Sequence, residues 1–485
     1  MSWFLGGIAF LILGYLAYGR LVERILGPDD RKTPCVAHPD GVDYVALPKW
    51  KNLLIQLLNI AGVGPVVGVI LGIKFGKVAL LVIPVGCVFM GAVHDFCIGF
   101  MSMRRNGANL PKLVTESLGR GYAAVFSWVM VALLLLVVAV FINVPASLVD
   151  RTWLPGGTHF WTVVGAIFAY YVAATLFPVD KIIGRVYPVF GALLILGSAL
   201  LAASLVLAGF AAPSILDDCA GFAAFKEENP LFPCLFVTIA CGIISGFHAT
   251  QSPIVARTIT SEREARATFF GMMVLEGVIA MVWAAAALAI YNVAPENLVL
   301  DGASVLGNIA AKFLGPWVGG VTVAAVVVLA VTSGDTALRS ARLSIGEMCR
   351  IDQVPLGRRV LTCLPPCLAV AGLLAWSNTS PKSFSNLWNY FAWGNQLIAV
   401  TALLTAAVWL LREGKGPKAL VALLPGVFMC MVVTTFIFWA WPSKGQVWGV
   451  VPGGLPLPVA ACAGGCVTLL AVLSVLRRGR REKSA

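Results

Sequence analysis

The sequence AGVGPVVG, Ala61–Gly68, lies in the middle of an apolar stretch that is long enough to cross a lipid bilayer. It holds three glycines and one proline in eight residues. Both residue types weaken an α-helix, yet a chain inside a bilayer needs a helix because no water is there to bind an unpaired peptide group. The stretch therefore predicts a helix that is interrupted at membrane depth.

The composition is that of a membrane protein. Of the 485 residues, 59% are hydrophobic and only 12% are charged, and the mean hydropathy is +0.88. A soluble globular protein carries about 25% charged residues. We therefore predict an all-α polytopic membrane protein with about 13 transmembrane helices, each an apolar window of about 20 residues. The predicted spans are Trp3–Tyr18, Leu53–Phe75, Val78–Phe100, Tyr122–Leu148, Phe160–Phe177, Tyr187–Ala211, Leu231–Phe247, Thr268–Tyr291, Pro316–Ser333, Val360–Trp376, Phe384–Leu411, Ala419–Trp441 and Leu457–Leu476.

The basic residues predict the orientation of the chain. No basic residue precedes the first span, whereas Arg20 and Arg24 follow it, so we interpret this span as a retained helix and not as a cleaved signal peptide. With the N-terminus outside, Lys and Arg fall roughly four to one on the cytoplasmic side, as the positive-inside rule requires. The N-terminus is then periplasmic and the C-terminus cytoplasmic. The net charge of +12 therefore indicates contact with the lipid bilayer, and we expect no nucleic-acid partner.

A second apolar span carries a similar interruption. CGIISGFHATQSP, Cys241–Pro253, combines two glycines and a proline with polar side chains. The interrupted spans are the second and the seventh, so they run antiparallel, as equivalent helices of two inverted halves would. Broken helices in corresponding positions of such halves mark the binding site of many secondary transporters. The residues that we assign to substrate binding on this basis are Gly62, Gly64, Pro65, Ser245, Gly246, His248 and Gln251.

The glycine spacing allows a second interpretation. Gly64, Gly68 and Gly72 are four residues apart, as are Gly242 and Gly246, and this is also the spacing of transmembrane helices that pack tightly. Each segment alone is as consistent with packing as with unwinding. The occurrence of two such segments, five spans apart, favours a binding site.

Four ionisable residues lie at membrane depth. His94 and Asp95 lie in GAVHDF, Glu276 lies early in the eighth span, and Asp335 lies in VTSGDTALRSAR. A charge at the bilayer centre costs about 2.5–3.5 kcal/mol or more, so we predict that these residues couple transport to an ion. The alternatives are structural hydrogen bonds and an i, i+4 pair of Asp335 with Arg339. His94 and Asp95 are adjacent on a helix, point about 100° apart and need not touch.

Signatures of enzymes and cofactor sites are absent from the sequence. It has no nucleophile elbow, no His-Glu-x-x-His motif and no phosphate loop. The 12 cysteines form no Cys-x-x-Cys pair, and there are only 4 histidines, so we expect neither an enzyme nor a cofactor. Cys219 and Cys234 flank one loop and can either pair or stay free. Asn395 lies among tryptophans. It either lines a polar cavity, or the tryptophans simply form an aromatic belt at the membrane interface.

Five motifs in order resemble the carbon starvation protein A (CstA) family of bacterial inner-membrane transporters, and in particular its shorter members. They are DGVDYV (Asp40–Val45), AGVGPVVG, GAVHDF followed by SMRRNG, SGFHATQSP, and TSGDTALRSAR. The resemblance implies uptake of peptides or pyruvate during starvation, and membership of the amino acid–polyamine–organocation superfamily. That superfamily has a five-plus-five inverted-repeat core. Here the repeats would be residues 51–212 and 213–412, with one extra helix in 1–50 and two in 413–485.

The same resemblance implies where a sodium ion would bind. In folds of this kind, sodium lies between the unwound first core helix and hydroxyl groups of the eighth. The corresponding positions are the backbone at Ala61 and Gly64 and the side chains of Thr332 and Ser333. If protons drive transport instead, the histidines and carboxylates at membrane depth become the coupling residues.

The sequence as a whole favours a secondary active transporter that imports a small carboxylate-bearing nutrient, coupled to H+ or Na+. Half-helix N-termini at the two interruptions, with their partial positive charge, would face the carboxylate. Peptide and pyruvate both fit this logic. An ion channel, a nutrient sensor with a transporter fold and an intramembrane enzyme are the alternatives, and the oligomeric state stays open.

Overall fold

The computed structural model describes residues 1–40, 44–154, 158–176, 180–351, 353 and 355–480, of which 180–188 are described by their backbone only. Three residues of the DGVDYV motif, 41–43, therefore lie outside the described residues. Throughout these ranges the chain forms helices and no strand. The α-helices in chain order are α1 Ser2–Leu13, α2 Gly19–Leu26, α3 Pro34–Ala37, α4 Lys49–Ile60, α5 Val69–Gly72, α6 Ala79–Gly86, α7 Ala92–Arg104, α8 Leu110–Leu118, α9 Arg120–Trp153, α10 Phe160–Leu176, α11 Asp180–Ala211, α12 Phe222–Glu228, α13 Leu231–Thr238, α14 Ala240–Ile243, α15 Gly246–Ala256, α16 Met272–Val293, α17 Gly302–Cys349, α18 Leu356–Ser377, α19 Pro381–Arg412, α20 Leu420–Trp439 and α21 Leu457–Arg480.

The predicted all-α membrane architecture is confirmed, whereas the predicted number of spans is matched only in part. Among the described residues, 10 helices are long and apolar enough to cross a membrane, or 11 if the bent pair Lys49–Ile60 and Gly64–Phe75 counts as one span. The other two predicted spans are α10, which is short, and the seventh, which is divided into α13, α14 and α15. The figure of about 13 therefore stays a prediction.

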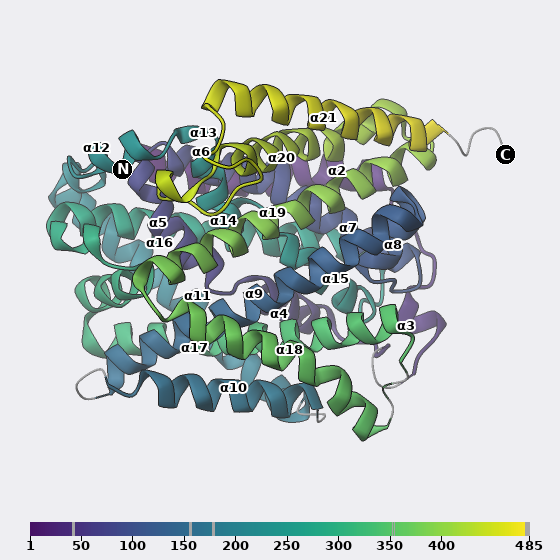
Figure 1. Cartoon of the computed structure of the whole chain (residues 1–485), viewed down its shortest axis with the longest axis horizontal. Coiled ribbons are helices and arrows are strands. Elements are labelled where there is room, and N and C mark those ends of the chain that lie inside the picture. Colours follow the sequence, from purple (N-terminus) through teal and green to yellow (C-terminus); the bar gives the residue numbers. More distant parts are fainter. Residues whose placement is uncertain (41–43, 155–157, 177–179, 352, 354, 481–485) are drawn as a thin grey trace.

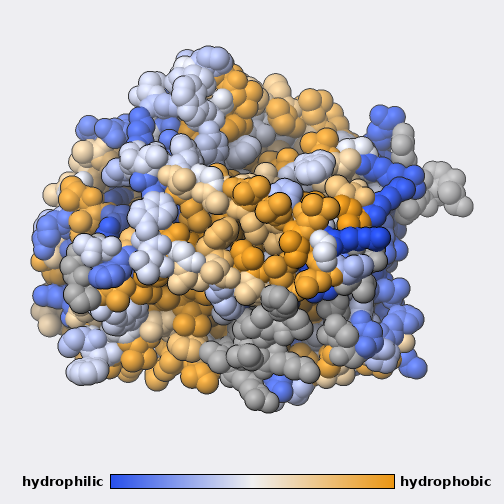
Figure 2. Space-filling model, turned by 60° about the horizontal axis from the view of Figure 1, so that its bottom comes forward, coloured by the Kyte–Doolittle hydropathy of each residue, from blue (hydrophilic) through white to orange (hydrophobic). Residues whose placement is uncertain are grey.

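The helices lie side by side, and most run along one common axis (Figure 1). α1 begins at one end of this bundle and α21 ends at the other. Figure 2 shows apolar side chains over the middle of one face and polar side chains gathered at its two ends. This is the distribution expected of helices that cross a bilayer, because only the ends of such helices reach water.

Both predicted interruptions are present. α4 ends at Ile60, the backbone leaves the helix through residues 61–63, and the helix resumes with a bend of 54°. In the second segment α14 ends at Ile243, residues Ile244 and Ser245 are extended, and α15 begins at Gly246. Both helices are thus interrupted within the glycine-rich segments that the sequence indicates, whereas Pro253 lies inside α15.

The glycines also pack the two interruptions against each other, so close packing and unwinding occur together. A Cβ added to Gly64 would lie 2.5 Å from the Cβ of Cys241 in α14. A Cβ added to Gly68 would lie 3.1 Å from the carbonyl oxygen of Thr238. Cys219 and Cys234, which the sequence left open as a pair, are both free thiols.

A buried ion pair holds three segments together at the end of the bundle that is rich in Arg and Lys. Arg104, the last residue of α7, donates to both carboxylate oxygens of Glu262 at 2.9 and 2.8 Å and to the carbonyl oxygen of Gly27 at 2.7 Å. Glu262 also accepts from the backbone N–H of Asp29 at 3.0 Å. The hydrogen bonds from Arg31 hold the pKa of Asp29 well below its ordinary range. The network fixes the segment after α2 to α7 and to the segment before α16.

Candidate functional site

Four buried ionisable side chains meet inside the bundle. His94 Nδ1 lies 2.7 Å from Asp95 Oδ1, and the other oxygen of Asp95 lies 3.0 Å from His248 Nδ1. His248 Nε2 faces Glu276 Oε2 at 3.6 Å. The exposed fraction of each side chain is 0–1%. We call this set, which runs from His94 through Asp95 and His248 to Glu276, the titratable cluster.

The titratable cluster joins three helices that are distant in the sequence. His94 and Asp95 lie on α7, His248 on α15 and Glu276 on α16. The sequence allowed His94 and Asp95 to point apart, but the two side chains are in contact. His94, Asp95 and Glu276 are predicted coupling residues, and His248 is a predicted substrate-binding residue that also becomes a coupling residue if protons drive transport. The structure thus places His248 between both groups of candidates.

Two π-helical turns precede the helices that carry the cluster. η4, Cys87–Gly91, leads into α7, and η8, Arg266–Gly271, leads toward α16. A π turn inserts an extra residue into a helix and so rotates everything that follows it, which is why such turns are frequent at functional sites. No pattern in the sequence signals these turns. The face on which His94, Asp95 and Glu276 lie could therefore not be read from helical periodicity.

Some polar atoms of the cluster have no fixed partner. Among the residues that the structure describes, His94 Nε2 and both carboxylate oxygens of Glu276 have no hydrogen-bond partner and are buried. Two carboxyl groups and two imidazoles offer many protonation states, but only states near neutrality are inexpensive in a low-dielectric interior. A change in one group must therefore be matched by a change in another or by a charge that enters the site.

The first interruption lies directly beside the cluster. The imidazole of His248 interacts with the backbone of Ile60, whose carbonyl accepts from the N–H of Gly62 at 2.8 Å. On its other side, a Cβ added to Gly62 would lie 2.9 Å from the ring of Phe141 and 3.8 Å from the hydroxyl of Ser333. The unwound backbone is thus enclosed by the cluster on one side and by α9 and α17 on the other.

The second interruption is capped by a side chain of α19. Asn395 Oδ1 accepts from the backbone N–H of Phe247 at 2.8 Å, and its Nδ2 donates to Ser245 Oγ at 3.0 Å. A Cβ added to Gly246 would lie 2.7 Å from the backbone nitrogen of Ala399. In this conformation Asn395 therefore caps the N-terminus of α15. Sequence reasoning named Asn395 for a polar cavity and missed this capping role.

The remaining predicted site residues are divided between two places. Pro65 is buried in the π-helical turn η2, Gly64–Gly68, and Gln251 is buried on α15, where its Nε2 donates to Thr250 Oγ1 at 3.0 Å. Asp335 accepts a hydrogen bond of 2.6 Å from Tyr170, which places it on the side of α17 that faces α10. Gln251 thus lies on the same helix as His248 of the titratable cluster, whereas Asp335 contacts α10.

The predicted sodium ligands fit such an ion only in part. Ser333 Oγ donates to the carbonyl oxygen of Leu58 at 3.5 Å, so this hydroxyl does face the end of α4. Thr332 Oγ1 instead donates to Leu329 of its own helix at 2.9 Å. Ala61 lies at the interruption with a non-helical backbone and is buried. The hydroxyl of Ser333 therefore lies beside the first interruption, and the sodium site stays a prediction.

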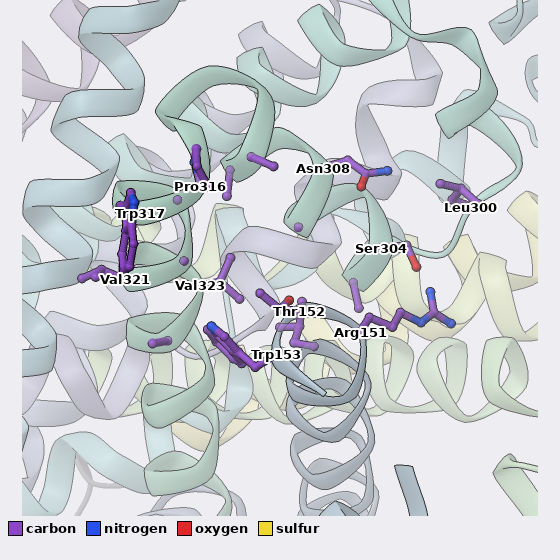
Figure 3. A pocket seen from close by; sticks show the side chains of 18 residues that line it. Arg151, Thr152, Trp153, Leu300, Ser304, Asn308, Pro316, Trp317, Val321 and Val323 are labelled. Carbon is purple, nitrogen blue, oxygen red and sulfur yellow. The ribbon is translucent and has the colours of Figure 1, made fainter. Parts of the chain in front are cut away.

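Two adjoining cavities open at the end of the bundle where α9 ends. The larger, of about 910 Å³, is bordered by Arg151, Trp153 and Trp317 (Figure 3). The smaller, of about 610 Å³, reaches inward along α9 to Asn143. Two residues further along α9, the ring of Phe141 packs on Phe247 and Phe391, with ring centroids 6.3 and 6.1 Å apart. An aromatic layer thus separates the interruptions from these cavities.

Two solved structures have a similar overall fold. A mutant of the Eremococcus coleocola manganese transporter matches with a TM-score of 0.58 at 14% identity, over 90% of this chain and 98% of that chain. MhsT in complex with L-phenylalanine matches with a TM-score of 0.52 at 16% identity, over 90% of this chain and 99% of that one. At these identities the likeness concerns the fold alone.

Sequence comparison identifies the family. An uncharacterized membrane protein of Haemophilus influenzae is 41% identical over 63% of this chain and 96% of its own length. The peptide transporter CstA of Escherichia coli is 24% identical over 88% of this chain and 79% of its own length. The pyruvate/proton symporter BtsT of the same organism is 27% identical over 57% of this chain and 47% of its own length. The family model "Carbon starvation protein CstA" matches residues 1–169, 153–311 and 297–436, and the chain belongs to this family.

Proposed function

We propose that the protein is a secondary active transporter that imports a small carboxylate-bearing nutrient, a peptide or pyruvate, across the bacterial inner membrane during nutrient limitation, with the proton as coupling ion. The observation that carries the proposal is the titratable cluster and its contact with the first interruption. The names of the relatives, a peptide transporter and a pyruvate/proton symporter, support the substrate class.

In the proposed mechanism the substrate binds between the two interruptions. Gly62, Gly64 and Pro65 line it from one side, and Ser245 and Gly246 from the other. A substrate carboxylate would displace the side chain of Asn395 from the N-terminus of α15, where the free N–H groups and the helix dipole favour an anion. Because Asn395 belongs to α19, its displacement would couple substrate binding to a movement of α19. One bundle of helices would rock against the other to alternate access.

Coupling follows from the charge balance of the cluster. His248 lies between Asp95 and Glu276, each of which faces a different ring nitrogen, and it also interacts with the backbone of Ile60. Uptake of a proton by Glu276 or by an imidazole changes the charge that the unwound backbone experiences. An anionic substrate at the interruptions offsets that added positive charge, so proton and substrate bind best together.

The test compares two modes of transport in proteoliposomes. Labelled pyruvate and labelled alanyl-alanine are offered under an inward proton gradient, under an inward sodium gradient and, for exchange, with no gradient. We expect accumulation of one of the two compounds under the proton gradient. The Glu276→Gln variant should lose this accumulation and retain exchange, because it can bind substrate but cannot take up the proton.

The matched control is Glu296→Gln, which alters an exposed glutamate before α17 and should behave as the parent protein. Proton-driven accumulation by Glu276→Gln at the parent level would contradict the coupling role of the cluster. An uncoupled conductance in the parent would instead favour a channel. Binding of either compound without any transport would favour a nutrient sensor.

Sodium is the second candidate for the coupling ion, and the position of Ser333 favours it. Its hydroxyl faces Leu58 and the unwound residue Gly62, as a sodium ligand on the eighth core helix would. Accumulation under a sodium gradient at equal pH on both sides would select this alternative.

The orientation and the repeat layout are part of the same proposal. The Arg- and Lys-rich end would be cytoplasmic, with the N-terminus of the chain periplasmic. Residues 51–212 and 213–412 would form the two inverted repeats. The antiparallel arrangement of the two interrupted helices supports this division.

A further inference from the structure

A row of polar side chains, buried except for the half-buried Thr258, leads away from the titratable cluster along α4 and α15. The two helices are antiparallel: as the residue number falls along α4, the number of the facing residue rises along α15 and the segment after it. From the centre of the bundle outward, the pairs are Ile60 with His248, Gln56 with Ser252, and Asn52 with Thr258. We call the side chains of this row, together with Gln251, the polar seam.

The contacts of the polar seam become tighter toward the Arg- and Lys-rich end. Gln56 Nε2 lies 3.4 Å from Ser252 Oγ, whereas Thr258 Oγ1 donates to Asn52 Oδ1 at 2.7 Å. Asn52 Nδ2 also donates to the carbonyl oxygens of Leu47 and Thr258 at 3.2 and 3.3 Å. The seam thus connects the buried cluster with the segment that precedes α4.

Two amide oxygens in the middle of the polar seam lack a protein partner. Gln56 and Gln251 have side chains that are fully buried, and within the described ranges neither Gln56 Oε1 nor Gln251 Oε1 accepts a hydrogen bond. A buried acceptor without a partner is costly, and native proteins satisfy such atoms with bound water. These two oxygens point to a site for water or a hydronium ion beside His248.

A purely structural role explains the polar seam less well. Helices that only need to pack at this depth use small residues, as the glycines of the two interruptions do. The seam instead places two large amides there, although polar groups at membrane depth are costly. Apart from His248, none of its own side chains is titratable; the titratable cluster lies at one end, and Lys51 and Arg257 are sequence neighbours of Asn52 and Thr258 at the other.

We propose that the polar seam conducts protons between the titratable cluster and the Arg- and Lys-rich end of the protein, through water bound by Gln56 and Gln251. The inference rests on the proposed proton coupling and adds the route. A proton leaves Glu276 or His248 for the first water, a second proton leaves that water toward Asn52 and Thr258, and each water regains its neutral form.

The experiment separates this route from substrate transport. The variant Gln56→Leu keeps the side-chain size and removes the amide, and Ser252→Ala is a smaller change at the facing position. Thr405→Val is the matched control, because it removes from α19 a buried hydroxyl that has no partner among the described residues and is not part of the seam. Infrared spectroscopy after a rapid pH change follows the C=O stretch of protonated Glu276, assigned by its loss in Glu276→Gln.

We expect protonation of Glu276 to slow by about tenfold or more in Gln56→Leu, to slow less in Ser252→Ala and to keep the parent rate in Thr405→Val. Exchange of the transported compound at equal pH should stay near the parent rate in all three. Parent-like protonation rates in both seam variants would overturn the route and leave proton coupling intact. A Glu276 band that does not respond to pH in the parent would instead overturn the proposed coupling itself.

Discussion

The contact between Gly64 and Cys241 leads to a prediction that tests the geometry of the two interruptions. In Gly64→Ala the new Cβ would lie 2.5 Å from Cys241 Cβ and 2.6 Å from Cys241 Sγ. Carbon atoms in contact are normally about 3.5–4.0 Å apart, so α14 must recede by about 1 Å. Because Cys241 Cβ is fixed to the backbone, a rotamer change cannot relieve the clash. Overpacking of this kind costs about 1–3 kcal/mol.

The displacement separates the two halves of the proposed binding site, so we expect Gly64→Ala to reduce uptake by about tenfold or more. The assay is initial uptake in proteoliposomes, with the amount of inserted protein and its thermal stability measured in parallel. The double variant Gly64→Ala/Cys241→Gly adds a Cβ at residue 64 and removes the one at residue 241. It relieves the clash and should recover most of the lost uptake. Full activity of Gly64→Ala, or no recovery in the double variant, would refute the reasoning.

Three further variants address the cap, the ion pair and the hydroxyl beside the first interruption. Asn395→Leu should lower stability by about 1–3 kcal/mol in thermal unfolding, because it leaves a backbone N–H of α15 unpaired, whereas half-buried Asn389→Leu should cost less. Arg104→Gln should cost up to about 3–5 kcal/mol in the same measurement, since its buried glutamate partner loses its countercharge. Arg263→Gln, whose ion pair is exposed, should cost under about 1 kcal/mol. Ser333→Ala should leave proton-driven uptake unchanged, and a rise in the sodium concentration needed for uptake would show sodium coupling instead.

Much of the architecture could be predicted from the sequence, because the bilayer imposes a local rule. A stretch of about 20 apolar residues must become a helix there, and glycine and proline end a helix at predictable places. AGVGPVVG and CGIISGFHATQSP therefore located both interruptions. The short α10 and the three-part seventh span show where this rule weakens, since neither is a single long apolar helix.

The candidate site could be predicted only as a set of separate residues. His94, Asp95, Glu276 and Asp335 stood out because ionisable groups are costly at membrane depth. Nothing in their spacing showed that the first three would meet at His248 while Asp335 would meet Tyr170.

The sequence by itself determined that the chain is a helical membrane protein with two broken spans, since hydropathy and helix breaking depend on neighbours along the chain. The tertiary structure alone decided which polar groups touch. The π turns η4 and η8 set the faces of the helices that follow, and Asn395 reaches the second break from a helix about 150 residues away. Such contacts depend on how helices rotate and pack against one another, and that is a property of the whole bundle, which no local pattern contains.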